Sequence, residues 1–112
     1  MVSHRIKTMR NESREAKKDG AKLVKNSGRG ESKGDARLDS PNGVYSWLID
    51  YKHYENTFSV SRPNWDKLSK DAWNDNHRSP LIKVVYDNGM ELAILNWSDF
   101  IQLQTDAEYD HA

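Results

Sequence analysis

The turn Asp87-Asn88-Gly89 constrains the fold more than any other short segment of this chain, because strand-forming residues flank it on both sides. Such a turn between two apolar runs predicts a β-hairpin. Its expected strands are Leu81–Tyr86, which Pro80 opens, and Met90–Leu95. The chain is therefore expected to contain a sheet with an antiparallel pair near its carboxyl end.

Helical and extended segments alternate before this hairpin. Asn11 or Ser13 can cap a first helix, along which Ala16, Gly20 and Leu23 recur at helical spacing. A glycine-bearing polar loop follows at 26–34, then a brief strand at 36–38, a turn at 39–43 and a clear strand at 44–52 that is rich in β-branched and aromatic residues.

A second helix is expected to begin after Ser61, a good capping residue, and to end near Asn76. Its spacing predicts a buried stripe of Trp65, Leu68, Ala72 and Trp73. Ser98 can cap a last short helix through Leu103. The order of elements predicts an α/β or mixed α+β fold, with a central mixed sheet flanked by helices.

The chain of 112 residues has the length of one small domain. We expect a basic arm at 1–10, the folded domain at 11–104 and a flexible acidic tail at 105–112. Cysteine is absent from the sequence, which excludes a disulfide framework and a thiolate zinc site. Nothing resembles a signal peptide or a membrane span, so we expect a cytoplasmic protein without membrane contacts.

The net charge of zero conceals a strong asymmetry along the chain. Residues 1–37 contain eleven Lys and Arg against five Asp and Glu, a balance of +6, and the remainder carries −6. A basic segment of this kind suits a phosphate backbone. A solvated basic helix is the plainer interpretation of the same charges.

Asp50 and Lys52 carry the main chemical signal. They lie two residues apart on an expected strand, so both side chains should point to one face. Asp35 precedes the turn that would fold its strand against this one. A pair of aspartates can bind Mg²⁺ together with waters and phosphate oxygens, and a lysine can offset charge at phosphorus. The alternative is an ordinary Asp50–Lys52 ion pair on an exposed strand.

The order of these motifs resembles the PD-(D/E)xK nuclease superfamily, and within it the archaeal-type and phage Holliday junction resolvases. The resemblance covers about residues 11–95. It rests on a helix acid, a Ser-Gly-Arg-Gly loop element at 27–30, Lys33-Gly34-Asp35, and Ile49-Asp50-Tyr51-Lys52. Two departures are Gly34 where the family has proline and Asp50 where it more often has glutamate.

The resemblance implies a restriction-endonuclease-like fold and a set of site residues. Asp35, Asp50 and Glu12 would hold Mg²⁺ or Mn²⁺, and Lys52 would complete the catalytic set. Glu15 is the second candidate for the helix acid. The implied DNA contacts come from the loop and from the basic segment: Ser27, Arg29 and Lys33 in the loop, and Arg10, Lys17, Lys18 and Lys22 before it.

The implied activity is phosphodiester hydrolysis by a metal-dependent endodeoxyribonuclease that cuts branched DNA during recombination, as a Holliday junction resolvase. Its partners would be branched or duplex DNA and a second copy of the chain in a homodimer. We expected the dimer surface on the second helix or at the strand Leu81–Tyr86. The alternatives are a nicking or degradative nuclease of the same fold and a non-catalytic nucleic-acid-binding module. His53 should face away from Lys52, and the tryptophans should belong to the core or to a dimer interface.

Overall fold

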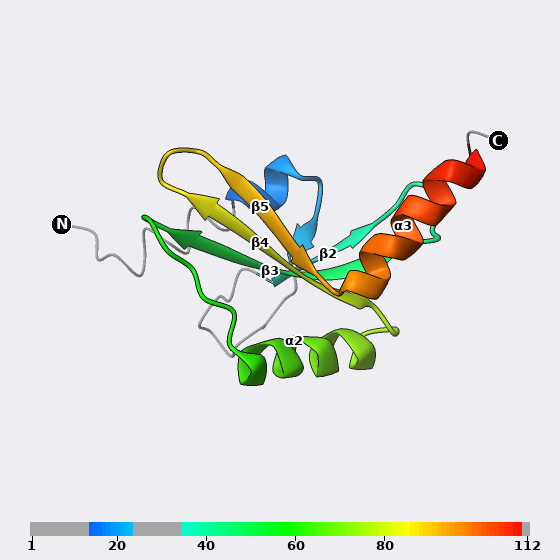
Figure 1. Ribbon diagram of the computed structural model, residues 1–112, viewed down its shortest axis with the longest axis horizontal. Helices are drawn as coiled ribbons and strands as arrows, with labels where there is room; N and C mark the ends of the chain where they lie inside the picture. Colours follow the sequence, from blue (N-terminus) through cyan, green and yellow to red (C-terminus); the bar gives the residue numbers. More distant parts are fainter. Residues whose placement is uncertain (1–13, 24–34, 111–112) are drawn as a thin grey trace.

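A five-stranded mixed sheet forms the centre of the molecule in the computed structural model, which describes residues 14–23 and 35–110 (Figure 1). The strands follow one another across the sheet in sequence order: β1 (Lys22–Leu23), β2 (Asp35–Asp39), β3 (Ser46–Tyr54), β4 (Ser79–Tyr86) and β5 (Glu91–Leu95). The helices of the described residues are a helical segment at 14–18, α2 (Arg62–Asn74) and α3 (Trp97–Asp110). The predicted class, a mixed sheet flanked by helices, is confirmed.

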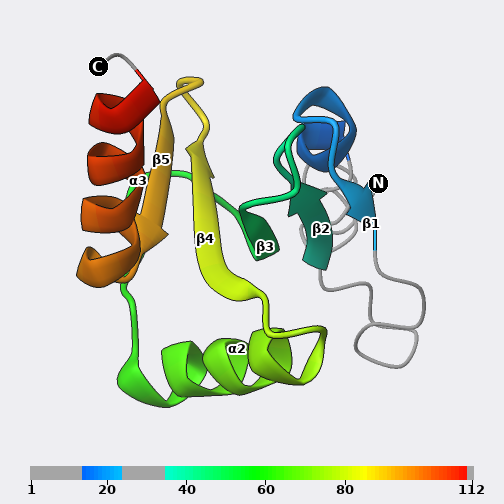
Figure 2. The same cartoon turned by 90° about the vertical axis from the view of Figure 1, so that its right-hand side faces the viewer.

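One parallel pair makes the sheet mixed. β3 and β4 run parallel, whereas the three other neighbouring pairs are antiparallel. Parallel neighbours need a crossover connection, and α2 supplies it. Figures 1 and 2 agree that α2 lies on one side of the sheet and the helical segment at 14–18 on the other. Both faces of the central strands are therefore covered.

The core consists of two apolar clusters, one on each face of the sheet. β3 contributes to both because its side chains alternate: Leu48 packs with Leu68 and Ala72 of α2, whereas Ile49 and Tyr51 pack with the opposite cluster. The second cluster is completed by three small residues, Ala16, Ala21 and Ala36. β3 therefore contributes to the core on both faces, and a charged side chain on it lies close to buried apolar residues.

Local signals set the ends of the helices. Ser61 caps α2, since its side chain accepts a hydrogen bond from the Asn64 backbone N–H at 3.2 Å, as the sequence predicted. The first helix ends earlier than predicted and does not include Gly20 or Leu23. Gly20 has a φ of 76°, and Ala21 N–H donates to Ala16 C=O at 2.9 Å, which closes the helix in a Schellman turn. Leu23 instead belongs to β1, a strand that the sequence pattern did not reveal.

The carboxyl-terminal helix is longer than predicted. α3 continues to Asp110, whereas the sequence placed its end at Leu103 and a frayed segment after it. Asp106 lies in that segment and is held by two hydrogen bonds, one from the Tyr45 hydroxyl and one from Gln102 at 3.0 Å. The contact with Tyr45 joins α3 to the start of β3, far away in sequence, so a local pattern could not show it.

Trp73 was predicted to be buried and is 60% exposed. Residues advance by about 100° along a helix, which puts Trp73 about 100° from the centre of the stripe formed by Trp65, Leu68 and Ala72. Trp73 therefore lies at the border of the buried face and stacks on His77, with ring centroids 3.9 Å apart.

Both predicted dimer surfaces are used within the chain itself. Leu68 of α2 is buried against the sheet, and β4, which contains Leu81–Tyr86, lies between β3 and β5. Leu68 and the two paired edges of β4 are therefore not open to a second copy, whereas Trp73 of α2 is exposed. Within the described ranges, 14–23 and 35–110, no helix has the length and apolar character needed to cross a membrane.

Candidate active site

The pairing of β2 with β3 brings together the two aspartates predicted as metal ligands. In this antiparallel pair, Asp35 and Asp50 are direct Cα partners. Opposite residues of an antiparallel pair lie about 4.5–5.5 Å apart and project to the same face. Both carboxylates therefore stand side by side on the face that α2 covers.

Lys52 projects to this same face, two residues after Asp50. Its Nζ atom lies 3.3 Å from Asp50 Oδ2. The other carboxylate oxygen, Oδ1, is buried. The sequence predicted this convergence of Asp35, Asp50 and Lys52, and the strand register produces it.

The three residues line a cleft of about 300 Å³ between the sheet and the first half of α2. The helix contributes Asn64, Lys67 and Asp71 to the opposite wall. A bidentate ion pair holds the far end of α2 over the sheet, because Arg37 of β2 donates to both carboxylate oxygens of Asp75 at 2.6 and 2.8 Å. β2 therefore supplies one acid of the cleft and also anchors the helix that walls it.

The donor set of the cleft suits a hard divalent cation. Mg²⁺ prefers oxygen ligands, usually one or two carboxylates together with waters and substrate phosphate oxygens. Asp35 and Asp50 provide two adjacent carboxylates, and the remaining volume admits water or a phosphodiester group. Two adjacent carboxylates are of the type that Mg²⁺ and Mn²⁺ take as ligands, and one of them, Asp50, also forms the ion pair with Lys52 that was the alternative interpretation.

Several predicted site residues lie outside the described part of the chain. They are the helix acid Glu12 and the DNA-binding candidates Arg10, Ser27, Arg29 and Lys33. Among the described candidates, Lys17 and Lys22 are exposed, and Lys18 is engaged with acids. The described part of the site is thus the Asp35, Asp50 and Lys52 set.

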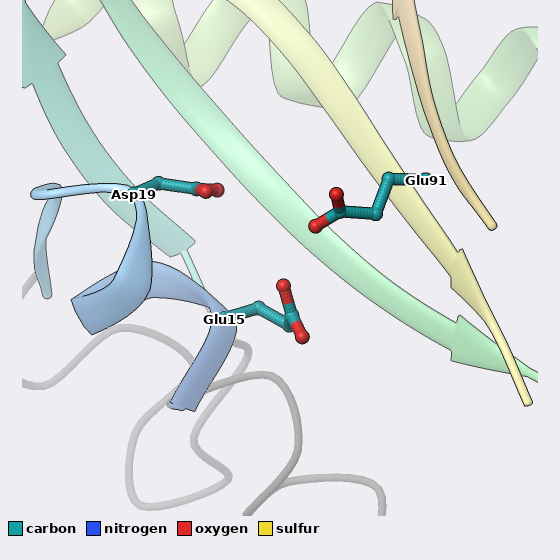
Figure 3. A group of neighbouring side chains, drawn as sticks. All are labelled: Glu15, Asp19 and Glu91. Carbon is teal, nitrogen blue, oxygen red and sulfur yellow. The ribbon is translucent and has the colours of Figure 1, made fainter. Parts of the chain in front are cut away.

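Glu15, the second candidate for the helix acid, belongs to a different group on the opposite face of the sheet. Its carboxylate converges with those of Asp19 and Glu91 (Figure 3), and one oxygen of each lies within 4.8 Å of the others. Lys83 of β4 reaches all three acids, with Nζ 2.7 Å from Asp19, 2.8 Å from Glu91 and 3.3 Å from Glu15. We call these four residues the Lys83 cluster.

The Lys83 ammonium accounts for the convergence of the three acids. Burial lowers the pKa of Lys83, but hydrogen bonds from its ammonium to Asp19 and Glu91 outweigh burial and raise the pKa above its ordinary value. Hydrogen bonds from Lys18 and then Lys83 lower the pKa of Glu91 to about 2. The cluster is an ionic network that ties the helical segment at 14–18 to β4 and β5, with the Lys83 ammonium at its centre.

Tyr51 joins this network from β3. Its hydroxyl donates a hydrogen bond to Asp19 Oδ2 at 3.0 Å. Burial, followed by that hydrogen bond, raises the pKa of the Tyr51 phenol above its ordinary value, so the phenol stays protonated. The sequence analysis did not single out the cluster. Its one local signal is Lys83, a charge within an otherwise apolar strand.

His53, Trp47 and Trp65 have structural surroundings, whereas Trp73 and Trp97 are exposed. The His53 side chain points to the face of β3 opposite that of Lys52, as predicted, and its Nδ1 atom lies 3.5 Å from Asp87 Oδ1. Trp65 packs against the core and donates from Nε1 to Asn96 at 3.2 Å, which links α2 to the start of α3. Trp47 packs on the opposite core cluster and stacks with Tyr45.

Comparisons of this chain with protein-family profiles, with curated proteins and with solved structures found no match. The proposed function therefore rests on the geometry of the cleft and on the sequence motifs that its residues form.

Proposed function

We propose that this protein is a metal-dependent DNA endonuclease that cuts branched DNA as a Holliday junction resolvase. One observation carries the proposal: Asp35 and Asp50 are direct partners across two strands, with Lys52 beside them in one cleft. The resemblance to PD-(D/E)xK nucleases likewise implies that Asp35, Asp50 and Lys52 form one site.

The residues of the cleft have distinct roles in phosphodiester hydrolysis. Bound Mg²⁺ or Mn²⁺ would supply Lewis-acid polarisation of the phosphate and an activated water. Asp35 and Asp50 would hold the cation, with Glu12 as a further ligand from the first helix. The Lys52 ammonium, already 3.3 Å from Asp50, is placed to donate to a phosphate oxygen and to offset the negative charge that develops as water attacks phosphorus.

The substrate assignment combines charge with symmetry. The basic balance of +6 in residues 1–37 suits a phosphate backbone, which the loop and arm residues would contact. A four-way junction has two equivalent strands related by a twofold axis, so a homodimer presents one cleft to each. Such an enzyme would act in the cytoplasm of a bacterial or archaeal cell, including a host that carries a phage genome.

Two alternative functions can be told apart by experiment. A nicking or degradative nuclease would use the same cleft on another DNA form. A non-catalytic binding module would use the basic segment alone, and the alignment of Asp35 with Asp50 favours an enzyme over such a module.

Asp50→Asn tests the proposed chemistry. The substitution removes the carboxylate charge at nearly constant volume, so we expect cleavage of a synthetic four-way junction in Mg²⁺ to be abolished. Binding in Ca²⁺ should be retained because phosphate affinity comes mainly from basic residues. The measurement is a gel assay with the junction beside a linear duplex of the same sequence.

Asp66→Asn is the matched control, because Asp66 lies on α2 with its side chain largely exposed and does not line the cleft. It should cut as the unmodified protein does. Full cleavage by Asp50→Asn would refute the assignment of the cleft. Loss of binding together with cleavage in a folded protein would favour a different role for Asp50.

A further inference from the structure

Exposed apolar side chains are concentrated in one segment of the chain, from the end of the turn before β5 to the first turns of α3. Five of the ten large apolar residues that are exposed in the described part of the chain fall between positions 90 and 101: Met90, Leu92, Trp97, Phe100 and Ile101. They lie on β5, on the turn before it and on the first turns of α3. A concentration of this kind indicates an interaction surface rather than scattered exposure.

β5 also has a free hydrogen-bonding edge. It is the last strand of the sheet, and no other strand of the described residues pairs with its outer side. Tyr86 N–H donates to Met90 C=O at 2.9 Å, so hydrogen-bonded pairs recur at every second position from there, at Leu92 and Ile94. The backbone groups of Glu91, Ala93 and Leu95 therefore point outward, away from β4.

The usual protections of an edge strand are missing from β5. Its sequence, Glu-Leu-Ala-Ile-Leu, contains no proline and no lysine. Its one charge, Glu91, forms ion pairs with Lys18 and Lys83, each 2.8 Å away. The strand is therefore open to pairing with a further strand.

We propose that β5 pairs antiparallel with β5 of a second copy of this chain, about a twofold axis through Ala93. The outward-pointing groups of Ala93 would then bond to those of its own equivalent. The pairing is self-complementary: Leu92 meets Ile94 of the second copy, and the smallest side chain of the strand lies at the axis. Glu91 meets Leu95 rather than another Glu91, so like charges do not face each other across the pair.

The same register explains the exposed start of α3. Pairing about Ala93 places Asn96 opposite Met90 of the second copy. Trp97 then lies next to the hairpin of that copy, where an exposed indole and an exposed thioether can pack together. β5, its turn and α3 thus form one continuous surface that a second copy covers from both sides of the axis.

This dimer rests on the proposed function and specifies how the two clefts are arranged. A twofold axis perpendicular to the sheet keeps both clefts on the same face of a continuous sheet of ten strands, five from each copy. The two β3 strands are then five inter-strand spacings apart, about 24 Å at about 4.8 Å each. Two equivalent clefts facing one side can engage one branched DNA molecule together.

Ala93→Cys tests the pairing directly, because the chain contains no other cysteine. Partners in a hydrogen-bonded antiparallel pair have Cα atoms about 5.5 Å apart, within the range that a disulfide spans. Mild oxidation at micromolar protein should give a covalent dimer on a non-reducing gel. Lys22→Cys places the thiol on β1, the opposite edge of the sheet, and should remain monomeric on the same gel.

Light scattering provides the second measurement. The unmodified protein should have twice the 13.0 kDa mass of one chain, and Ala93→Lys, which places two like charges at the axis, should have the mass of one chain with an unchanged circular dichroism spectrum. A monomeric unmodified protein, or a dimer in which Ala93→Cys does not cross-link, overturns the proposal. Neither result bears on the cleft, which the Asp50→Asn assay tests separately.

Discussion

Replacing Lys83 by methionine should destabilise the fold, because the Lys83 ammonium is mostly buried and contacts three acids. Methionine keeps the length and the apolar part of the lysine side chain but removes the ammonium. Three carboxylates, with oxygens within 4.8 Å of one another, then lose their shared cation. Lys83 is 14% exposed, so water cannot fully replace the lost interactions.

The magnitude follows from burial. Removing one partner of a buried ion pair costs about 3–5 kcal/mol, because the other charge is left uncompensated. The acids of the Lys83 cluster keep some solvent access, and Lys18 remains bound to Glu15 and Glu91. We therefore expect the free energy of unfolding to fall by about 2–3 kcal/mol, which corresponds to a melting temperature lower by about 8–12 °C.

Urea denaturation followed by circular dichroism measures this change, with Lys18→Met as the control. Lys18 contacts two of the same acids, but its side chain is 59% exposed. Exposed ion pairs are screened by water and contribute little, so the control should lose much less stability than Lys83→Met. If both variants lost the same stability, the Lys83 cluster would not be the buried network described above.

Two further predictions concern stability. Glu91 has a pKa of about 2 in the folded protein against an ordinary 4.5, so the stability it contributes is complete above pH 4.5 and is lost as the pH falls toward 2. Melting temperatures between pH 6 and pH 2 should therefore fall less steeply for Glu91→Gln than for the unmodified protein, and parallel curves would contradict the assignment. Trp65→Ala should cost about 2–4 kcal/mol because it removes core packing and a hydrogen bond, whereas Trp73→Ala at its exposed position should cost less than about 1 kcal/mol. Equal losses in urea denaturation would contradict the burial seen for Trp65.

Local features of the sequence determined most of the elements and part of the site. The turn Asp87-Asn88-Gly89 indicates a hairpin, and Ser61 indicates the start of α2, because turn and cap chemistry depends on neighbouring residues alone. The two-residue spacing of Asp50 and Lys52 places them on one face of any strand. That Asp35 joins them was also predicted, because a short turn folds its strand back against β3.

Tertiary packing decided the features that join distant segments. The Lys83 cluster draws its members from the first helical turn, β4 and β5, and no local period relates them. The length of α3 depends on the contact between Asp106 and Tyr45, and the exposure of Trp73 depends on which face of α2 meets the sheet. The pairing order of the strands placed β4 inside the sheet and β5 at its edge. Periodicity shows which side of an element is buried, but only the assembled sheet determines which neighbour buries it.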